Sequence, residues 1–568
     1  MNNPTIQPSN MDGASAFTEL NSIEKQKLNL RPMEYYKEID TLSLDSLGDR
    51  DRFYLQNFGI YNNALSDDEF MIRLRFPAGR ISNQNLLDIA KIAIQHNASI
   101  LLTARAGIQL HGLDEDNIMG IFQKIDALGI NSWQTFGDNI RNIATDVFDG
   151  CGKYNIIEVY PYIQQMQEFI LKVPEYVGML PRRISTAISG SFANGGSFFA
   201  SDLYFALAKK ENVYGFNVYM GGKNSELAQD ANIFLRKEEV VEFFKAFVIA
   251  FHKYGLRQYR NRTRLFHLLE KIGIEKFKSH IEDEYKNNLP PKGTLCLEKT
   301  NFKDFEELKN GDYSYCYRTN FAKITADELL NIATLSIQNN YEVRIGIDQQ
   351  FYIFGLKDTK ISLSSNIKNT TVLACAGSEF CPYSYWNIKD ETEFLPLERI
   401  EKYKLVVGFS GCMKGCAKHQ HSDIGLVGLR TSEYSYTQKI ARLYLGGEYS
   451  FGKQVAKQIF KGIPLPHLKE IINVIIDEFE NSIYDDFEEF SQYILNHLSA
   501  NFLALWFLGK IESKKDAKLE VGDEMDLLIR HFNEFEFCKF LEDDFSEALR
   551  FQTKKLWSQV PSAESFLN

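Results

Sequence analysis

The alternation of apolar and polar residues predicts the same unit twice, once beginning near residue 80 and once near residue 323. Residues 80–97 and 323–340 carry apolar side chains at helical spacing, and strand-like runs follow each stretch. Eight of eighteen positions are identical between RISNQNLLDIAKIAIQHN and KITADELLNIATLSIQNN, at a constant separation of 243 residues. The sequence therefore predicts an internal duplication in which each copy contains a helix followed by strands.

A second pair of similar segments follows the first pair. ISTAISGS, SDLYF and FNVYMGGKNS, between residues 184 and 225, match KLVVGFSGC, SDIGL and ARLYLGGEYS, between residues 404 and 450. The order along the chain is therefore A, B, A′, B′. We expect an α+β protein built from two pseudo-symmetric halves.

The two halves have diverged unequally. Polar and basic residues of the first A unit are replaced in the second, and the second B unit has gained a cysteine. The pairs are Arg105 and Asp348, Gln109 and Tyr352, His111 and Phe354, and Ser191 and Cys412. The first A copy therefore holds the candidate polar site.

Polar residues in the first A unit share strand faces. FMIRLRFPAG (70–79) alternates with period two, which places Arg73 and Arg75 on one face. The same parity pairs Thr103 with Arg105 and Gln109 with His111. A solvated sheet face is the alternative, but the loss of these residues from the second repeat favours a cationic surface for an anionic ligand. Arginine binds carboxylates in a bidentate manner.

Four cysteines form two close pairs. Cys375 and Cys381 are separated by five residues, and Cys412 and Cys416 by three. Four thiolates in such pairs can hold a cubane iron–sulfur cluster. A zinc knot is the alternative, but structural zinc pairs usually have two to four intervening residues.

Composition narrows the class of protein. At 568 residues the chain predicts several domains, and 44% apolar content is typical of a globular protein. A net charge of −11 argues against non-specific nucleic-acid binding. The N-terminal residues lack the pattern of a signal peptide, and no apolar run approaches membrane-spanning length. We expect a cytoplasmic protein that binds neither nucleic acid nor membrane.

The segment GFSGCMKGCAKHQHSDIGLVGL (408–429) resembles the sirohaem-binding signature of the sulfite and nitrite reductase family. FMIRLRFPAGR, LTARAGIQLHG, DNIRNI and LPRRISTAISG resemble further segments of that family, and the resemblance extends from about residue 50 to 490. It implies two cofactors, sirohaem and a [4Fe-4S] cluster. It also implies that Cys416 ligates both the cluster and the sirohaem iron.

The resemblance assigns the site residues in three groups. Arg73, Arg141, Arg183 and Ser185 fall on substrate-side positions. Sirohaem contacts are Thr103, Arg105, Gln109, His111, Asn142 and Cys416. The cluster ligands are Cys375, Cys381, Cys412 and Cys416.

Two positions depart from the family pattern. Ser185 stands where sulfite reductases have lysine and plant-type nitrite reductases have asparagine, and Arg183 precedes it where both have lysine. The missing cation at Ser185 favours the monoanion nitrite. Lys414 lies in CMKGC, where the family usually has Pro-Asn between the cysteines.

The activity implied is six-electron reduction of nitrite to ammonia or of sulfite to sulfide. The main alternative is a sulfite reductase proper, and a non-catalytic iron–sulfur or zinc scaffold is the alternative from another class. No G-x-G-x-x-G fingerprint lies between a strand and a helix. A separate electron donor is therefore expected, either ferredoxin or a flavoprotein.

The repeats and the resemblance together predict one domain made of two ferredoxin-like half-repeats, plus two α/β domains that bind sirohaem and the cluster. The expected division is an N-terminal arm over 1–60, the first half-repeat over 61–120, and a sirohaem- and substrate-side domain over 121–300. The second half-repeat follows over 301–358, then a domain that ligates the cluster and sirohaem over 359–490, and a helical C-terminal extension over 491–568.

Overall fold

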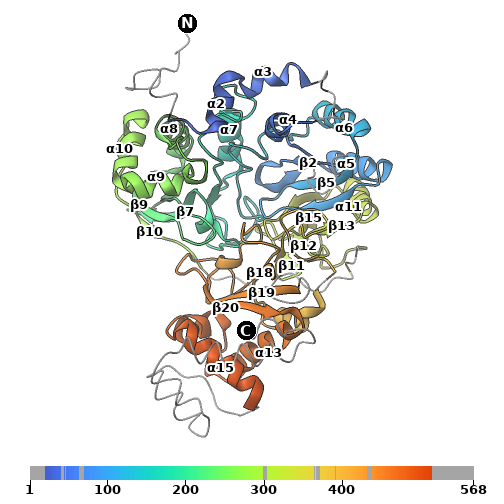
Figure 1. Ribbon diagram of the computed structural model, residues 1–568, viewed down its shortest axis with the longest axis vertical. Coiled ribbons are helices and arrows are strands. Elements are labelled where there is room, and N and C mark those ends of the chain that lie inside the picture. The colour runs from blue at the N-terminus through green and yellow to red at the C-terminus, as the bar shows by residue number, and fades with distance from the viewer. Residues whose placement is uncertain are drawn as a thin grey trace.

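The structure is a computed structural model that describes residues 19–39, 47–62, 69–298, 303–363, 371–390, 392–431 and 438–513, together with Leu42, Leu44 and Ser365. Within these residues the strands form four five-stranded sheets (Figure 1). Two sheets belong to the A units and two to the B units. The predicted duplicated α+β architecture is confirmed.

The first A sheet has the order β1-β2-β5-β4-β13 and the second has the order β11-β12-β15-β14-β3. The strands of the first unit are β1 (Ile60–Asn62), β2 (Phe70–Leu74), β3 (Arg80–Ile81), β4 (Ser99–Leu102) and β5 (Ile108–Leu113). Those of the second unit are β11 (Phe305–Glu307), β12 (Tyr313–Tyr317), β13 (Lys323–Ile324), β14 (Glu342–Ile345) and β15 (Phe351–Leu356). From β2 to β5, each strand starts 243 residues before its counterpart.

The two A sheets exchange their third strands. Strand β3 pairs antiparallel with β14, and β13 pairs antiparallel with β4, so each unit completes the sheet of the other. The exchange is reciprocal and therefore preserves the pseudo-two-fold symmetry. The halves form one domain with a shared core.

The helices α5 (Asn83–Gln95) and α11 (Ala326–Asn339) pack against each other in that core. Ser82 caps the first helix by accepting a hydrogen bond from the Asn85 N–H. Thr325 caps the second helix by accepting a hydrogen bond from the Glu328 N–H. Their buried positions coincide through the repeat, with Leu86, Ile89, Ala90 and Ala93 matching Leu329, Ile332, Ala333 and Ser336. Each helix is followed by a strand at the same distance. A further helix, α6 (Glu115–Ala127), follows β5.

The B sheets have a common topology. In the first, β6 (Thr186–Ser189) runs parallel to β7 (Leu203–Lys210), followed by antiparallel β8 (Val213–Met220) and β9 (Gln229–Arg236), with β10 (Thr294–Leu295) at the edge. In the second, β16 (Val372–Ala374) and β17 (Val407–Ser410) run parallel to β18 (Ile424–Thr431), followed by antiparallel β19 (Gln438–Leu445) and β20 (Lys457–Pro464). Strands β6 and β7 start 221 residues before β17 and β18.

Helices accompany the B sheets and both ends of the described chain. The first B unit has α7 (Tyr160–Ile170), α8 (Val240–Tyr254), α9 (Leu265–Ile272) and α10 (Ile274–Tyr285), and the second has α12 (Leu397–Lys402), α13 (Leu465–Glu480) and α14 (Phe487–Phe490). The N-terminal helices are α2 (Ser22–Asn29), α3 (Pro32–Tyr36) and α4 (Asp49–Leu55). Helix α15 (Ala500–Ser513) packs on α13 and β20 and buries Trp506. The rest of the predicted extension, 514–568, lies outside the described residues. No described helix has the length and apolar character needed to cross a bilayer.

Candidate active site

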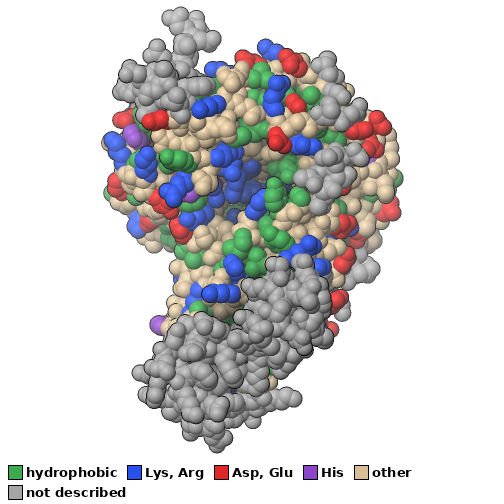
Figure 2. All heavy atoms as spheres, viewed as in Figure 1, with side chains coloured by type: hydrophobic (Ala, Val, Ile, Leu, Met, Phe, Trp, Pro, Cys, Tyr) green, Lys and Arg blue, Asp and Glu red, His purple; other side chains and the backbone are tan. Residues whose placement is uncertain are grey.

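Four arginines, Arg73, Arg105, Arg141 and Arg183, form what we call the arginine group. Arg73 comes from β2, where it pairs in register with Gln109 of β5, and its guanidinium lies 3.8 Å from the centre of the Phe136 ring. With the Gln109 amide oriented so that its oxygen faces Arg73, Oε1 accepts a hydrogen bond from Arg73 Nε at 2.9 Å. Gln109 therefore fixes the direction of the Arg73 guanidinium. On the face drawn in Figure 2, Lys and Arg side chains gather in a central hollow.

A tight turn presents Arg105, where the sequence predicts a strand face. Strand β4 ends at Leu102, and Thr103 Oγ1 accepts a hydrogen bond from the Gly107 N–H at 3.1 Å. Asn142 Nδ2 donates to the Arg105 carbonyl at 2.9 Å and to the Phe76 carbonyl at 2.7 Å. The strand-face interpretation is wrong for this residue because the chain reverses direction between β4 and β5.

Arg141 and Arg183 lie on neighbouring extended segments. Ile140 bridges to Ile184, and Ala144 to Ala187, both in parallel. Arg141 Nη2 donates to the Gly137 carbonyl at 2.9 Å, whereas Arg183 Nη1 is buried and has no hydrogen-bond partner. In the first B unit, residues 140–144 thus occupy the place beside β6 that β16 occupies beside β17.

The arginine group is short of negative charge. None of its members forms an ion pair with a carboxylate among the described residues. Burial, with neighbouring arginines as the next cause, lowers the pKa of Arg73 and of Arg183 to about 9. Burial lowers the pKa of Arg141 as well, with Arg183 the next cause. All four arginines remain cations near neutral pH. The space around them therefore attracts a polyanion.

Arg75 does not share the face of Arg73. It is 1% exposed, and its guanidinium donates to Gln167 Oε1 at 2.9 Å and to the carbonyls of Ile140 and Arg141 at 3.0 and 2.8 Å. The period-two prediction fails here because β2 ends at Leu74. Arg75 holds in place the segment that carries Arg141.

His111 connects the arginine group to the cysteine loops. Its ring is 2% exposed and lies 4.8 Å from the centre of the Phe380 ring, next to Cys381 in the sequence. Burial, aided by Arg73 and Lys389, lowers the pKa of His111 to about 3. The imidazole is therefore neutral at physiological pH and is no reservoir of protons.

Ser185 is engaged by a carboxylate. Its hydroxyl donates to Asp202 Oδ2 at 2.6 Å, and its N–H donates to the same atom at 2.9 Å. Arg264 Nη2 lies 2.8 Å from the other Asp202 oxygen. Asp423 accepts from the Val406 N–H in the same way in the second B unit. Sequence reasoning missed Asp202 and Arg264, although the repeated Ser-Asp of SDLYF and SDIGL was a usable signal.

The four cysteines of the cysteine group, Cys375, Cys381, Cys412 and Cys416, lie on two loops that are in contact with each other. Cys375 follows β16 and Cys412 follows β17, two parallel neighbours in one sheet. The Cys416 thiol interacts electrostatically with each of the other three thiols. It also interacts with Arg73, Arg105 and Arg183. Cys416 is therefore the point where the cysteine group meets the arginine group.

Backbone N–H groups point at the other three sulfurs. Cys375 Sγ accepts from the Gly411 N–H at 3.1 Å, and the N–H groups of Tyr383 and Lys414 bond to Cys381 and Cys412. Hydrogen bonds to sulfur are typical of iron–sulfur sites. Among the described residues, no three His, Cys, Asp or Glu side chains converge as ligands of a single metal ion. The four thiols with their amide donors suit a cluster.

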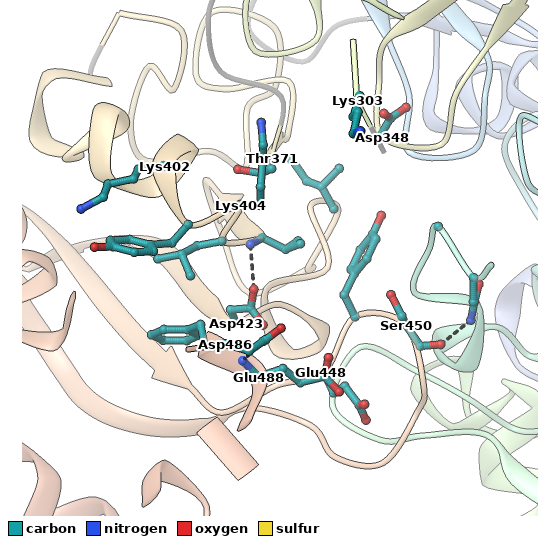
Figure 3. A pocket seen from close by; sticks show the side chains of 18 of the residues that line it. Lys303, Asp348, Thr371, Lys402, Lys404, Asp423, Glu448, Ser450, Asp486 and Glu488 are labelled. Carbon is teal, nitrogen blue, oxygen red and sulfur yellow. Dashed lines mark hydrogen bonds between the residues drawn. The ribbon is translucent and has the colours of Figure 1, made fainter. Parts of the chain in front are cut away.

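A second cavity, of about 390 Å³, lies where the repeat places the counterpart of this site (Figure 3). Five residues that line it are the repeat counterparts of residues in the first site. Cys316 corresponds to Arg73, Asp348 to Arg105, Tyr352 to Gln109, Lys404 to Arg183 and Gly195 to Cys416. Lys404 pairs with Glu401, and burial raises the pKa of Asp348 to about 6. Figure 3 shows Asp348 and Glu448 among its acidic side chains. Of the two repeat-related cavities, the one with the arginine group suits an anion.

Together, the fold and the site define a redox protein that binds a polyanionic cofactor beside an iron–sulfur cluster. The family model described as "Nitrite/Sulfite reductase ferredoxin-like half domain" matches residues 64–128, and "Nitrite and sulphite reductase 4Fe-4S domain" matches residues 136–289. These matches cover the first A and B units, and the cysteine group lies in the corresponding second B unit.

Known proteins extend the similarity over most of the chain. A ferredoxin–nitrite reductase of Leptolyngbya laminosa is 25% identical over 501 residues, which cover 82% of this chain and 98% of that protein. Sulfite reductase [ferredoxin] 2 of Mycolicibacterium paratuberculosis is 26% identical over 460 residues, covering 72% and 82%. The solved NirA protein of Mycobacterium tuberculosis shares the fold, with a TM-score of 0.77 and 21% identity, over 85% of this chain and 97% of that one. The two family models and these relatives support the nitrite and sulfite reductase family for this chain, as its sequence motifs predict.

Proposed function

We propose that this chain is a sirohaem- and [4Fe-4S]-dependent reductase that converts nitrite to ammonia in a six-electron reaction. The place of Cys416 carries the proposal. Its thiol interacts with the other three cysteines and also with Arg73, Arg105 and Arg183. One residue thus joins a set of cluster ligands to a cavity for a polyanion.

The residues present fit both cofactors. Sirohaem carries eight carboxylates, and the arginine group lacks carboxylate partners within the described chain, with Arg183 Nη1 left unbonded. Thr103 and Asn142 fix the turn that presents Arg105. Burial raises the pKa of Cys375 to about 12, so its thiolate would depend on bound iron. The matched family model, whose description names a 4Fe-4S domain, supports the cluster.

In this proposal the substrate-side residues act electrostatically. Arg73, Arg141 and Arg183 bind the oxyanion and polarise its oxygens. Sirohaem and the cluster, when bound, supply the electron-transfer chemistry. Arginine is a poor acid and His111 is neutral, so ordered water delivers the protons. Ser185 is held beside these residues by its two hydrogen bonds to Asp202.

Nitrite is the preferred substrate in this proposal, and sulfite, reduced to sulfide, is the alternative. Position 185 carries a neutral hydroxyl, and the relative from Leptolyngbya laminosa is named a nitrite reductase. The relatives' names also support ferredoxin as the electron donor, with a separate flavoprotein as the alternative.

The test is an anaerobic visible spectrum of the purified protein, with iron and acid-labile sulfide content, followed by titration with nitrite and with sulfite. The proposal expects a sirohaem spectrum with four cluster irons, perturbed at lower concentration by nitrite. Cys416→Ala should lose these signals, while Cys296→Ala, which changes a cysteine far from the group in sequence, should retain them. A protein that holds zinc and no sirohaem after reconstitution would contradict the proposal.

A further inference from the structure

Ser185 lines a small cavity beside Arg105 and adds no positive charge to its wall. The Ser185 hydroxyl and N–H both bond to Asp202, and Arg264 holds the other oxygen of that carboxylate. The position is therefore anchored but carries no cation of its own. Arg105 and Ser185 line the same small cavity, so an anion bound there would meet a neutral hydroxyl.

Lys418 lines this cavity from the opposite repeat. It follows Cys416 by two residues, and its strongest electrostatic neighbours are Arg105, Arg183 and Arg264, with Asp202 as a carboxylate. The side chain is half-buried, and no hydrogen bond or ion pair reaches its ammonium from the described part of the chain. An ammonium held among arginines without a partner needs an anion to balance it.

The backbone holds Lys418 in a conformation that lysine rarely adopts. Its φ of 57° lies in the left-handed region, which favours glycine or asparagine. The Lys418 N–H donates to the Gly415 carbonyl at 3.1 Å, and its own carbonyl accepts from the His421 N–H and the Ser422 hydroxyl. A turn fixed on both sides therefore keeps a lysine at the edge of the arginine group. Unfavourable backbone conformations of this kind gather at functional sites.

We propose that Lys418 supplies the cation that position 185 lacks and binds an anionic group of the bound ligands. This inference rests on the proposed function. The shared chemistry is an oxygen anion, either a carboxylate of the tetrapyrrole or an oxygen of the substrate. The A unit and first B unit would thus provide the arginines, and the second B unit the last cation together with the cysteines.

The experiment compares Lys418→Gln with Lys469→Gln in the full chain. Lys469 is an exposed lysine on α13 of the same B unit, outside the cysteine loops. Three quantities are measured: sirohaem bound per chain, the dissociation constants of nitrite and sulfite by anaerobic spectral titration, and the midpoint of urea unfolding. Lys418→Arg and the double variant Ser185→Lys/Lys418→Gln complete the set.

We expect Lys418→Gln either to bind at least tenfold less sirohaem per chain or to bind nitrite and sulfite at least tenfold more weakly, while Lys469→Gln matches the wild type. Less sirohaem with unchanged anion binding in the remaining loaded protein identifies a cofactor carboxylate. Full sirohaem content with weakened anion binding identifies the substrate. In either case Lys418→Arg and the double variant should restore the loss, because each returns a cation to the cavity.

Two results would overturn the inference. One is wild-type sirohaem content and anion affinity in Lys418→Gln. The other is a loss that neither Lys418→Arg nor the double variant restores and that accompanies a lower unfolding midpoint, because that pattern assigns Lys418 a structural role. A wild-type protein that binds no sirohaem would instead count against the proposed function, so the two failures are distinguishable.

Discussion

The Lys27 ammonium lies 2.7 Å from Asp138 Oδ2, and the side chains of both residues are at most 1% exposed. Lys27 also donates to the Leu180 carbonyl at 2.8 Å, and Asp138 pairs with Arg182 and Arg260. The N-terminal helix α2 is thereby tied to the two segments that carry Arg141 and Arg183.

Replacing Lys27 by Met should therefore destabilise the protein. Removing one partner leaves the Asp138 carboxylate buried with less compensation, which costs about 3 kcal/mol. The free energy of unfolding in urea measures the effect. Lys91→Met, at an exposed position of α5, serves as the control and should change it by less than about 0.5 kcal/mol. Equal effects of the two substitutions would contradict the buried pair.

Asp138 should also make stability depend on pH. Lys27, with Arg260 and Arg182, lowers the pKa of Asp138 to about 2. Because the folded pKa lies below the unfolded value of about 3.9, the stabilisation is complete above pH 4 and is lost as the pH falls towards 2. The difference in unfolding free energy between wild type and Asp138→Asn should shrink by about 2 kcal/mol from pH 6 to pH 2. A difference that is constant over this range would refute the assignment.

Replacing Arg75 by Met should lower the stability of the protein, whereas replacing Arg73 by Met should weaken anion binding. Arg75→Met leaves the carbonyls of Ile140 and Arg141 without their donors and should cost about 3 kcal/mol of stability. Arg73→Met removes a cation from a group of like charges, so the unfolding midpoint should hold while anion binding weakens. Urea unfolding and anaerobic spectral titration separate the two. A stability loss in Arg73→Met equal to that in Arg75→Met would be inconsistent with these roles.

Gly428 makes room for Trp386 beneath the cluster loop. A Cβ atom at Gly428 would lie 1.2 Å from Trp386 Nε1, and the indole is 1% exposed. The Trp386 carbonyl accepts hydrogen bonds from the Ser378 N–H and the Ser384 hydroxyl, on either side of Cys381. Gly428→Ala should cost about 3 kcal/mol and reduce the iron content, because the indole cannot stay in place.

The matched control for Gly428→Ala is Gly120→Ala, within α6. A Cβ atom at Gly120 would meet nothing within 4 Å. The substitution should raise the free energy of unfolding by about 0.5–1 kcal/mol, because alanine favours the helix. Iron content should be unchanged. If the alanine at 428 were tolerated as well as the one at 120, the packing argument would fail.

The duplicated elements and the cysteine group could be predicted because each leaves a pattern along the chain. Helix α5 and helix α11 have the same apolar spacing, and the four cysteines occur in close pairs. The turn at Arg105 and the inward direction of Arg75 could not be predicted, because the alternation of apolar and polar residues does not show where a strand ends. Lys27 and Lys418 resemble surface lysines in the sequence. Their positions follow from tertiary packing of segments more than a hundred residues apart.

The strand exchange between β3 and β13 constrains how the chain folds during synthesis. Each two-residue strand completes a sheet whose other members lie in the opposite half, about 240 residues away. At about 5–20 residues per second, the ribosome needs roughly 10–50 s to make that distance. Throughout this interval β4 has an open edge and β3 has no partner. The nascent first half therefore stays exposed to premature association, and native contacts of such long sequence separation slow folding.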